Sequence, residues 1–466
     1  MAFGLVLSLA PISTPPPISR ASGADPGIST EGDLPIPHLT GHFTISLTGG
    51  TLAGDACLTN IASQDDSVTI VLNSGLRIRS VTGAIFPAVR EEIEPGGAAI
   101  RHTFLRRDTQ PDPQTGEDSP ETICLEYSGA FPVYDPDAGN YRETDESSVI
   151  AFTGSLLRAR GISRWHPTVY TPSTGLAAEA MTFVIDIQCA ECNHILVNGV
   201  GIEAGPSARF ETDTPRELLL VAGDLAVREA GGITFIGRDV PEESAESFAS
   251  TVGEVITFLE GYTTLPFGDA PRVVTIPAVR APRRGQLWGF LSDPVLAIVG
   301  MTVPEVVEAL ESTGRPRQAV LGFVAHELAH RYFGWRLGGG SPQRDLFGEP
   351  FAVYLEMKAL RFFEGDAAYT RSLQNLREAA AQMNFPALPD ADADSFAGSG
   401  YRYTFAPAAL FSLEDRIGEE LMRATLAELL RAPEAERYLA DFSFLEKAAK
   451  RAGVTSEIWA QWKGLP

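Results

Sequence analysis

The chain has 466 residues, of which 44% are hydrophobic and 21% are charged, so it can form two or more globular domains and is not a disordered polypeptide. Its 37 Lys and Arg against 60 Asp and Glu give a net charge of −23, which excludes nucleic acid and anionic membranes as main partners. No stretch of the sequence approaches the run of about 20 apolar residues that a transmembrane helix needs.

Residues 1–37 are expected to be a signal-like segment followed by a flexible linker. Residues 1–11 are apolar, a Pro- and Ser-rich stretch follows, and residues 21–24 are small, as in the cleavage region of a secretory signal. The basic start that such signals carry is missing, because the first positive charge is Arg20. We expect an exported protein, periplasmic or extracellular, and the sequence leaves open whether this segment is cleaved.

Residues 38–240 are expected to form an N-terminal antiparallel β-sandwich-like domain. Short runs rich in Val, Ile, Thr and Phe alternate apolar and polar residues between breaks of Gly, Pro, Asp and Asn, which is typical of half-buried strands. Such runs occur at 42–47, 67–72, 76–81, 122–127, 181–187 and 217–221.

The four cysteines also lie in this β half. Two disulfides, Cys57–Cys124 and Cys189–Cys192, would suit an exported protein. The Cys-x-x-Cys spacing of the second pair also occurs in redox sites and in halves of zinc sites, so the sequence leaves the pairing open.

Residues 241–466 are expected to form a mainly helical domain. Apolar residues recur at helical spacing, and Gly- and Pro-rich breaks separate the segments. Helices are predicted at 242–259, 317–335, 349–363, 371–383, 407–417, 419–431 and 443–452, with a brief strand at 273–276.

The helix predicted at 317–335 carries the candidate metal site. His326 and His330 are four residues apart, so one helical face presents two imidazoles to one metal ion. The surrounding residues are apolar, and two unpaired histidines in a buried helix would be costly unless they bind something. Glu327 stands beside the pair as the candidate general base, which completes the His-Glu-x-x-His motif of zinc hydrolases.

A third ligand is predicted at Glu349, nineteen residues after His330, at the start of the next helix. Pro350 suits a first helical turn, and three protein ligands that leave one position for water are typical of a catalytic zinc. Glu356 lies two turns further on the same face. It is either a group that orients a zinc histidine through its second nitrogen or an ordinary surface carboxylate.

These segments resemble the gluzincin metallopeptidases of the aminopeptidase-N family. The match includes the spacing His326-Glu327-x-x-His330, then eighteen residues, then Glu349, and the segment Glu349–Glu356 is similar to the family's Glu-Gly-Phe-Ala-x-Tyr-x-Glu. The resemblance covers roughly residues 39–418. It implies a thermolysin-like catalytic domain, one zinc ion and a peptide substrate, with Glu327 acting on the attacking water.

The resemblance also implies a tyrosine that stabilises the transition state. Tyr403 stands in that register, ahead of a predicted helix, although Phe405 and Ala406 replace the family's Lys-Gly. A phenol at this position could donate a hydrogen bond to the developing oxyanion. Tyr401 is the alternative.

One family motif is altered. Members usually carry Gly-x-Met-Glu-Asn, whose Glu grips the amino terminus of the substrate. Aligning this chain on Trp288 and Gly289 places Gln286 at the Glu position. Gln accepts a hydrogen bond but supplies no charge, so the anchor for the amino terminus would be weaker here.

The expected function is zinc-dependent peptide hydrolysis of the aminopeptidase type. The alternatives are a zinc endopeptidase, a hydrolase of non-peptide bonds, and a zinc-binding scaffold that does not turn over. The chain would be a short form without the C-terminal helical-repeat domain, and we expect a more open site for that reason. The peptide specificity, the oligomeric state and the physiological metal cannot be deduced from the sequence.

Overall fold

The computed structural model describes residues 36–61, 67–83, 85–94, 97–106, 122–135, 149–171, 176–178, 180–279, 287–334, 337, 341, 343–391, 393–396, 398–433, 436–437 and 440–463. All of them lie in one unit, Ile36–Pro466, and a separate unit, Met1–Pro35, contains none of them. The expected signal-like segment therefore falls outside the described residues. Among the described helices, none has the length and apolar character needed to cross a membrane.

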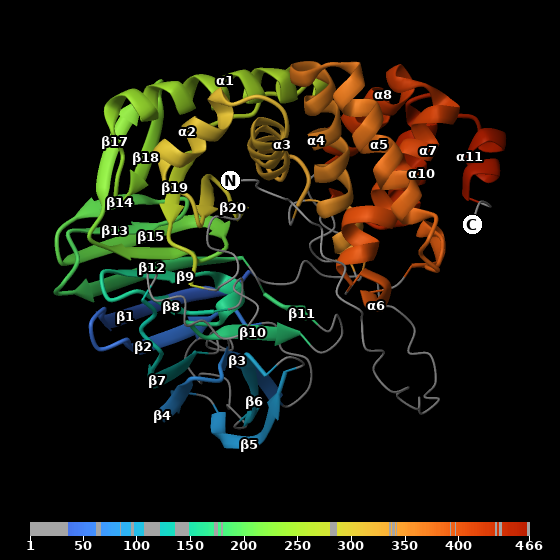
Figure 1. Cartoon of the computed structure of the whole chain (residues 1–466). Helices are drawn as coiled ribbons and strands as arrows, with labels where there is room; N and C mark the ends of the chain where they lie inside the picture. Colours follow the sequence, from blue (N-terminus) through green and yellow to red (C-terminus); the bar gives the residue numbers. More distant parts are fainter. Residues whose placement is uncertain are drawn as a thin grey trace. The chain divides into compact units, whose positions relative to one another are not determined.

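The largest β-sheet has the strand order β15-β12-β1-β2-β7-β4 (Figure 1). Its strands are β1 His38–Ser46, β2 Thr51–Thr59, β4 Leu76–Gly83, β7 Ile123–Ala130, β12 Met181–Cys189 and β15 Ser207–Arg216. In β2 the buried residues are Leu52, Gly54, Ala56 and Leu58, so every second position faces the core. Neighbouring strands are antiparallel except β1 and β12, which pair in parallel.

Two further sheets complete the β half, with strand orders β11-β10-β3-β6-β5 and β14-β13-β16-β9-β8. The first contains β3 Ser67–Asn73, β5 Ile85–Ile93, β6 Ala99–Arg106, β10 Thr168–Thr171 and β11 Leu176–Ala177. The second contains β8 Ala151–Phe152, β9 Leu156–Ala159, β13 His194–Val197, β14 Gly201–Ala204 and β16 Leu220–Gly223. Both disulfides considered from the sequence are present: Cys57–Cys124 joins facing positions of β2 and β7, and Cys189–Cys192 closes the end of β12.

His166 is buried in this β half and makes the stability of the protein sensitive to acid. Its ring is 1% exposed, Nδ1 lies 3.0 Å from the carbonyl oxygen of Pro167, and Nε2 has no hydrogen-bond partner among the described residues. Burial lowers the pKa of His166 from 6.5 to about 4. Between these values the unfolded chain binds the proton and the folded chain does not, so the free energy of unfolding falls as the pH falls.

We expect this single group to remove roughly 3 kcal/mol of stability between neutral pH and about pH 4. Urea unfolding of the protein at both pH values measures the loss. In His166→Phe the loss should be smaller by about 2–3 kcal/mol, whereas His42→Gln, which changes an exposed histidine, should leave it unchanged. Equal losses in His166→Phe and the unchanged protein would contradict the assignment.

A mixed sheet connects the β half to the helices, in the order β17-β18-β19-β21-β20. Its strands are β17 Ala226–Ala230, β18 Ile233–Gly237, β19 Arg272–Ile276, β20 Trp288–Ser292 and β21 Val295–Val299. The strands β18, β19 and β21 run parallel, and β17 and β20 are antiparallel edges. This sheet takes strands from both sides of residue 240, and the domain boundary at that residue stays a prediction.

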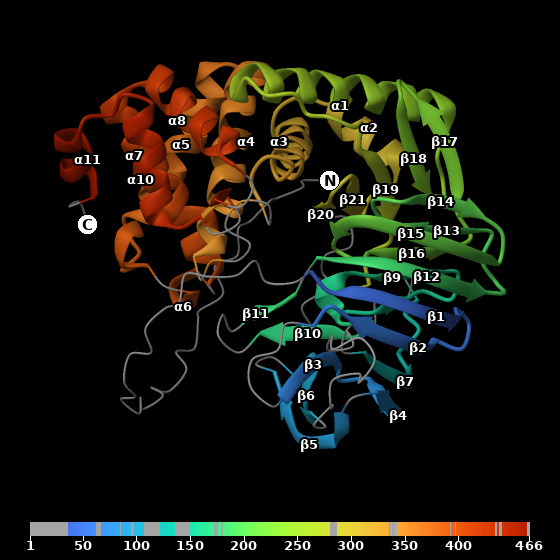
Figure 2. The same ribbon diagram turned by 180° about the vertical axis from the view of Figure 1, so that it is seen from behind.

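The described helices follow, together with short 3₁₀ turns η2 Gly161–Ser163, η3 Arg344–Leu346 and η4 Leu388–Asp390 and a π-helical turn η5 Tyr401–Phe405. They are α1 Glu242–Thr263, α2 Val303–Glu311, α3 Arg315–Ala329, α4 Glu349–Glu364, α5 Asp366–Ala380, α6 Ala393–Phe396, α7 Ala406–Ile417, α8 Glu419–Arg431, α10 Phe442–Arg451 and α11 Ser456–Lys463. Figure 2 shows the strands β1–β16 on one side and α4–α11 on the other, and α1 runs along the top from β17 and β18 toward α4.

The expected fold class is confirmed: β-sheets come first and a mainly helical region follows. Several predicted helix limits are wrong: α1 runs on to Thr263 and α5 ends at Ala380, and two differences are larger. The helix predicted to end at 335 ends at Ala329, because tight turns follow it, and α5 begins at Asp366 because Gly365, at φ +83°, ends α4 and starts α5 directly. The helix α2 was missed although Thr302 and Glu305 form a capping box, with hydrogen bonds of 3.4 and 2.7 Å.

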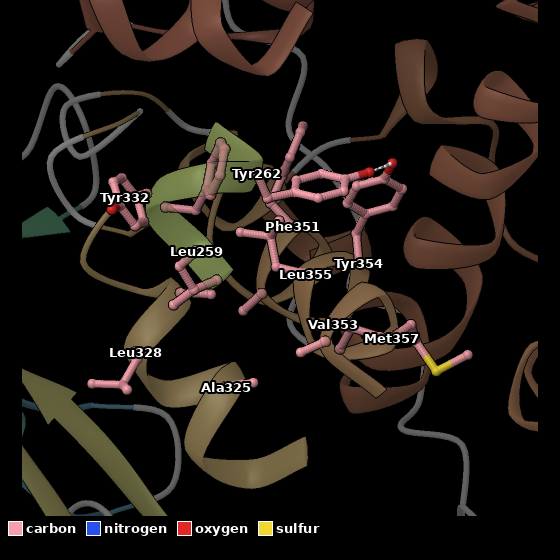
Figure 3. Close-up of a cluster of buried hydrophobic side chains, with 14 of the residues drawn as sticks. Leu259, Tyr262, Ala325, Leu328, Tyr332, Phe351, Val353, Tyr354, Leu355 and Met357 are labelled. Carbon is pink, nitrogen blue, oxygen red and sulfur yellow. Dashed lines mark hydrogen bonds between the residues drawn. The ribbon is translucent and has the colours of Figure 1, made fainter. Parts of the chain in front are cut away.

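A shared hydrophobic core supports α1, α3 and α4. Figure 3 shows buried side chains from all three helices, among them Leu259 of α1, Leu328 of α3 and Tyr354 of α4. The hydroxyls of Tyr262 and Tyr354 lie 2.9 Å apart and tie α1 to α4. Full burial of each large apolar side chain contributes about 1.5–3 kcal/mol, so this core keeps α3 and α4 at a constant distance.

Candidate metal centre

Helix α3 presents His326, Glu327 and His330 at its C-terminal end. The two imidazole rings are 5.0 Å apart between centroids, as expected for residues four apart on a helix. His330 is the first residue after the helix, and the chain then closes in tight turns, with the N–H of Tyr332 donating to the carbonyl of Ala329 at 3.0 Å. These turns bring the carbonyl of Phe333 back to His330, where Nδ1 donates to it at 3.0 Å.

Helix α4 brings in the third candidate ligand at its first residue, Glu349. Its Oε2 lies 3.0 Å from Nε2 of His326 and 3.4 Å from Nε2 of His330. Ligand atoms of the three residues all lie within 4.8 Å of one another. Two imidazole nitrogens and one carboxylate oxygen that converge in this way match the donor set of a catalytic zinc site.

Glu356 lies behind His326, away from the convergence point. Its Oε2 accepts a hydrogen bond from Nδ1 of His326 at 3.1 Å, which leaves Nε2 free to bind a metal. Gly322, one turn earlier in α3, lies against the same carboxylate, since a Cβ there would lie 3.1 Å from Oε1 of Glu356. Both histidines thus have Nδ1 engaged by an oxygen and Nε2 turned toward Glu349. The residues present fit a zinc ion.

The charges of the cluster are strongly coupled. Burial by itself lowers the pKa of His326, but its hydrogen bonds with Glu349 and Glu356 hold that pKa well above its ordinary value. Burial by itself raises the pKa of Glu349, but His330 and His326 hold it well below its usual range. A carboxylate that stays ionised between two imidazoles is a suitable ligand for a divalent cation.

Glu327 lies beside the ligands without joining them. Its side chain is 7% exposed, and burial raises its pKa, while the charges of His326 and His330 act in the opposite direction. A carboxyl whose pKa is raised above its ordinary value takes up a proton more readily, which suits a general base.

Tyr403 reaches the metal centre from η5. Its ring stacks on His326, with centroids 6.1 Å apart and an angle of 20° between the planes, and it is 40% exposed. Burial and then the neighbouring carboxylate of Glu349 raise the pKa of Tyr403 above its ordinary value, so the phenol keeps its proton and can donate it in a hydrogen bond. Tyr401, the alternative, is fully buried and donates to the carbonyl of Pro386 at 3.0 Å, so it is engaged in packing.

The structure thus brings together six of the seven residues singled out from the sequence: His326, Glu327, His330, Glu349, Glu356 and Tyr403. The seventh, Gln286, lies outside the described residues. The sequence analysis missed Arg160, whose positive charge acts on Glu327, because nothing in the pattern of the β half relates it to the zinc motif. It also missed the carbonyl of Phe333, because a contact with a backbone oxygen cannot be deduced from the type of residue.

The fold is similar to that of a solved hydrolase and of a solved zinc metallopeptidase. Against native yeast LTA4 hydrolase the TM-score is 0.62 and the sequence identity 16%, over 95% of this chain and 71% of the other. Against an M1 zinc metallopeptidase from Deinococcus radiodurans the TM-score is 0.56 and the identity 15%, over 93% of this chain and 94% of the other. No protein-family model and no curated protein sequence matches the chain. The resemblance seen in the sequence motifs is therefore confirmed as a likeness of fold to the M1 zinc metallopeptidases.

Proposed function

We propose that the protein is a zinc metallopeptidase of the aminopeptidase-N family that hydrolyses peptide bonds. The observation that carries the proposal is the convergence of His326, His330 and Glu349 beside a buried carboxylate that is not a ligand, Glu327. The similar fold of the M1 zinc metallopeptidase from Deinococcus radiodurans, a variant of which has been solved with a Tyr-Ser-Ala substrate, supports peptides as the substrate class.

His326, His330 and Glu349 would hold a zinc ion, which when bound would lower the pKa of a water molecule and polarise a carbonyl group. Glu327 takes the proton of the attacking water and passes it to the nitrogen of the leaving amine. Tyr403 donates a hydrogen bond to the oxygen that becomes negative as the carbonyl is attacked. Glu356 and the carbonyl of Phe333 hold the two histidine rings in the orientation that the ligands need.

In finer detail, the proposed activity is of the aminopeptidase type and the proposed location is outside the cytoplasm. The two disulfides support the location, because disulfides persist in oxidising compartments. A zinc endopeptidase, a non-peptide hydrolase and a non-catalytic scaffold are the competing functions.

Matched peptides with free and acetylated amino termini test the proposal, with mass spectrometry of the products. The zinc-loaded protein should cleave peptides, a chelator should abolish cleavage, and added zinc should restore it. Removal of single residues from free peptides alone would establish an aminopeptidase. Internal cleavage of both sets would establish an endopeptidase, and a protein that binds zinc but cleaves neither set would contradict the proposed function.

A further inference from the structure

A pocket opens on the side of helix α4 that faces away from the metal centre. Its volume is about 400 Å³, and residues of α1, α4, α8 and the start of α5 line it. Lys358, which lines the pocket, comes nine residues after Glu349 in α4. Nine residues correspond to two and a half helical turns, so the two side chains point to opposite sides of the helix. This α4 pocket is large enough for a small molecule and is separate from the metal centre.

One wall of the α4 pocket is aromatic. Phe258 of α1 and Phe362 of α4 line it, with ring centroids 5.2 Å apart and an angle of 38° between the planes. Phe362 is 67% exposed, whereas phenylalanine side chains are usually buried. A ligand with a flat apolar body would cover this wall and remove its apolar area from water, which is favourable.

Three cationic side chains line the same pocket: Lys358, Arg361 and Arg423. The side chain of Lys358 is 1% exposed, and its Nζ donates to Oε1 of Glu414 at 2.5 Å. The carboxylate of Glu419 lies 3.2 Å from Nη1 of Arg361 and 3.7 Å from Nζ of Lys358. Three positive charges are therefore opposed by two negative ones in the interior of the pocket.

The remaining carboxylate, that of Asp366, belongs to the rim. It accepts a hydrogen bond from Nε of Arg361 at 2.7 Å, but its side chain is 78% exposed, so water screens its charge. The interior thus keeps an excess of one positive charge, in a chain whose net charge is −23. A ligand with a single negative charge would balance this excess.

Arg423 is the cation that no carboxylate neutralises in the part of the chain that the structure describes. Its Nε and Nη2 donate to the carbonyls of Tyr262 and Gly261 at 3.1 and 2.5 Å, at the end of α1. Its guanidinium also lies 5.0 Å from the centroid of the Tyr262 ring. These contacts use two of the five N–H donors of a guanidinium and fix its plane, so three donors remain for a planar anion.

We propose that the α4 pocket binds a small carboxylate with an aromatic body, the carboxylate at Arg423 and the body against Phe258 and Phe362. The proposal goes beyond the proposed function, because hydrolysis at the metal centre uses none of the residues of this pocket. The carboxylate belongs either to a free aromatic acid or to the carboxyl-terminal residue of a peptide. Both sources offer the same planar anion and the same ring.

The test is calorimetric titration of the zinc-loaded protein with two matched pairs of compounds. The first pair is 3-phenylpropanoate and its uncharged amide, and the second is N-acetylphenylalanine and its amide. We expect each acid to bind at least about tenfold more tightly than its amide, because the amide lacks the charge that Arg423 meets. Equal binding of acid and amide in both pairs overturns the proposal.

Comparison of the two acids identifies the source of the carboxylate. N-acetylphenylalanine carries the backbone amide that precedes a carboxyl-terminal residue, and 3-phenylpropanoate does not. Tighter binding of N-acetylphenylalanine indicates the carboxyl terminus of a peptide. Equal or weaker binding indicates a free aromatic acid.

A variant of Arg423 locates the bound carboxylate. Arg423→Gln should reduce the ratio of the acid and amide affinities to about one, because the guanidinium is lost. Arg431→Gln is the matched control and should leave the ratio unchanged. Arg431 is an exposed arginine of the same helix, and its Nη2 donates to the hydroxyl of Thr264 after the end of α1, but it does not line the pocket. A ratio that stays the same in Arg423→Gln places the acid elsewhere, for example at the metal centre, and overturns the proposal.

Arg423 also holds the end of α1, so a second variant tests the pocket without disturbing that contact. Phe362→Ala changes an exposed side chain and should weaken the binding of 3-phenylpropanoate roughly two- to tenfold, the contribution expected of one contact between aromatic rings. Unchanged affinity in Phe362→Ala contradicts the aromatic wall and overturns the proposal even if Arg423→Gln fails to fold. Neither titration depends on hydrolysis, so a protein without peptidase activity would still test the pocket.

Discussion

Replacing Glu327 with Gln is expected to lower peptide turnover by about 10²- to 10⁴-fold and to leave metal binding intact. Gln has nearly the same shape, so the packing around this buried side chain is kept, but it has no oxygen that can take the proton of the attacking water. Glu327 is absent from the group of converging ligand atoms, so its replacement removes no ligand.

Steady-state kinetics on a cleaved peptide and the zinc content per chain check both halves of this prediction. Glu308→Gln, an exposed carboxylate on α2, is the matched control and should behave as the wild-type protein does. Normal turnover in Glu327→Gln would remove Glu327 from the mechanism. Loss of zinc together with activity would mean that its carboxylate supports the ligands rather than the proton transfer.

The core of the metal centre could be predicted from the sequence because it is encoded locally. His326, Glu327 and His330 belong to one helical turn, and Glu356 lies two turns after Glu349, so helical periodicity alone places each pair on one face. The link between the two helices came from the spacing that this chain shares with a known family. Helical periodicity in the sequence does not show how two helices that are joined by a loop pack against each other.

The rest depends on contacts between distant parts of the chain. Strand β1 pairs in parallel with β12, so that Phe43 faces Ile187. A local sequence pattern cannot identify a partner strand that lies so far away in the chain. The contacts of Arg160 depend on distant parts of the chain in the same way. Its neighbours in sequence indicate only a short strand, and its partners Glu217 and Phe290 come from other parts of the chain.

The end of α3 was mispredicted for a physical reason that bears on the site. Apolar residues continue at helical spacing through Tyr332 and Phe333, which favours a longer helix. In the structure those residues are buried through tight turns instead, and the carbonyl of Phe333 becomes available to His330. A longer regular helix would use that carbonyl within its own ladder, so the early end of α3 contributes to the orientation of the ligand.

Replacing Glu349 with Ala is expected to weaken zinc binding more than replacing Glu356 with Ala does, and to abolish hydrolysis. Glu349 supplies an ionised oxygen to the convergence point, whereas Glu356 contacts only the outer nitrogen of His326. Groups that orient a ligand typically change metal affinity by about 10- to 100-fold, and loss of a ligand should exceed that range. Zinc affinity measured in competition with a chelator ranks the two variants.

The ranking distinguishes the two carboxylates because both lie about 3 Å from the same imidazole, on opposite nitrogens. If zinc were held through Nδ1 of His326, Glu356 would be the ligand and the two effects would be exchanged. The contacts of His330 are evidence against that arrangement, because its Nδ1 donates to the carbonyl of Phe333 while its Nε2 faces Glu349. Equal losses in the two variants would mean that neither geometry holds, and a larger loss in Glu356→Ala would place the metal on the other side of the ring.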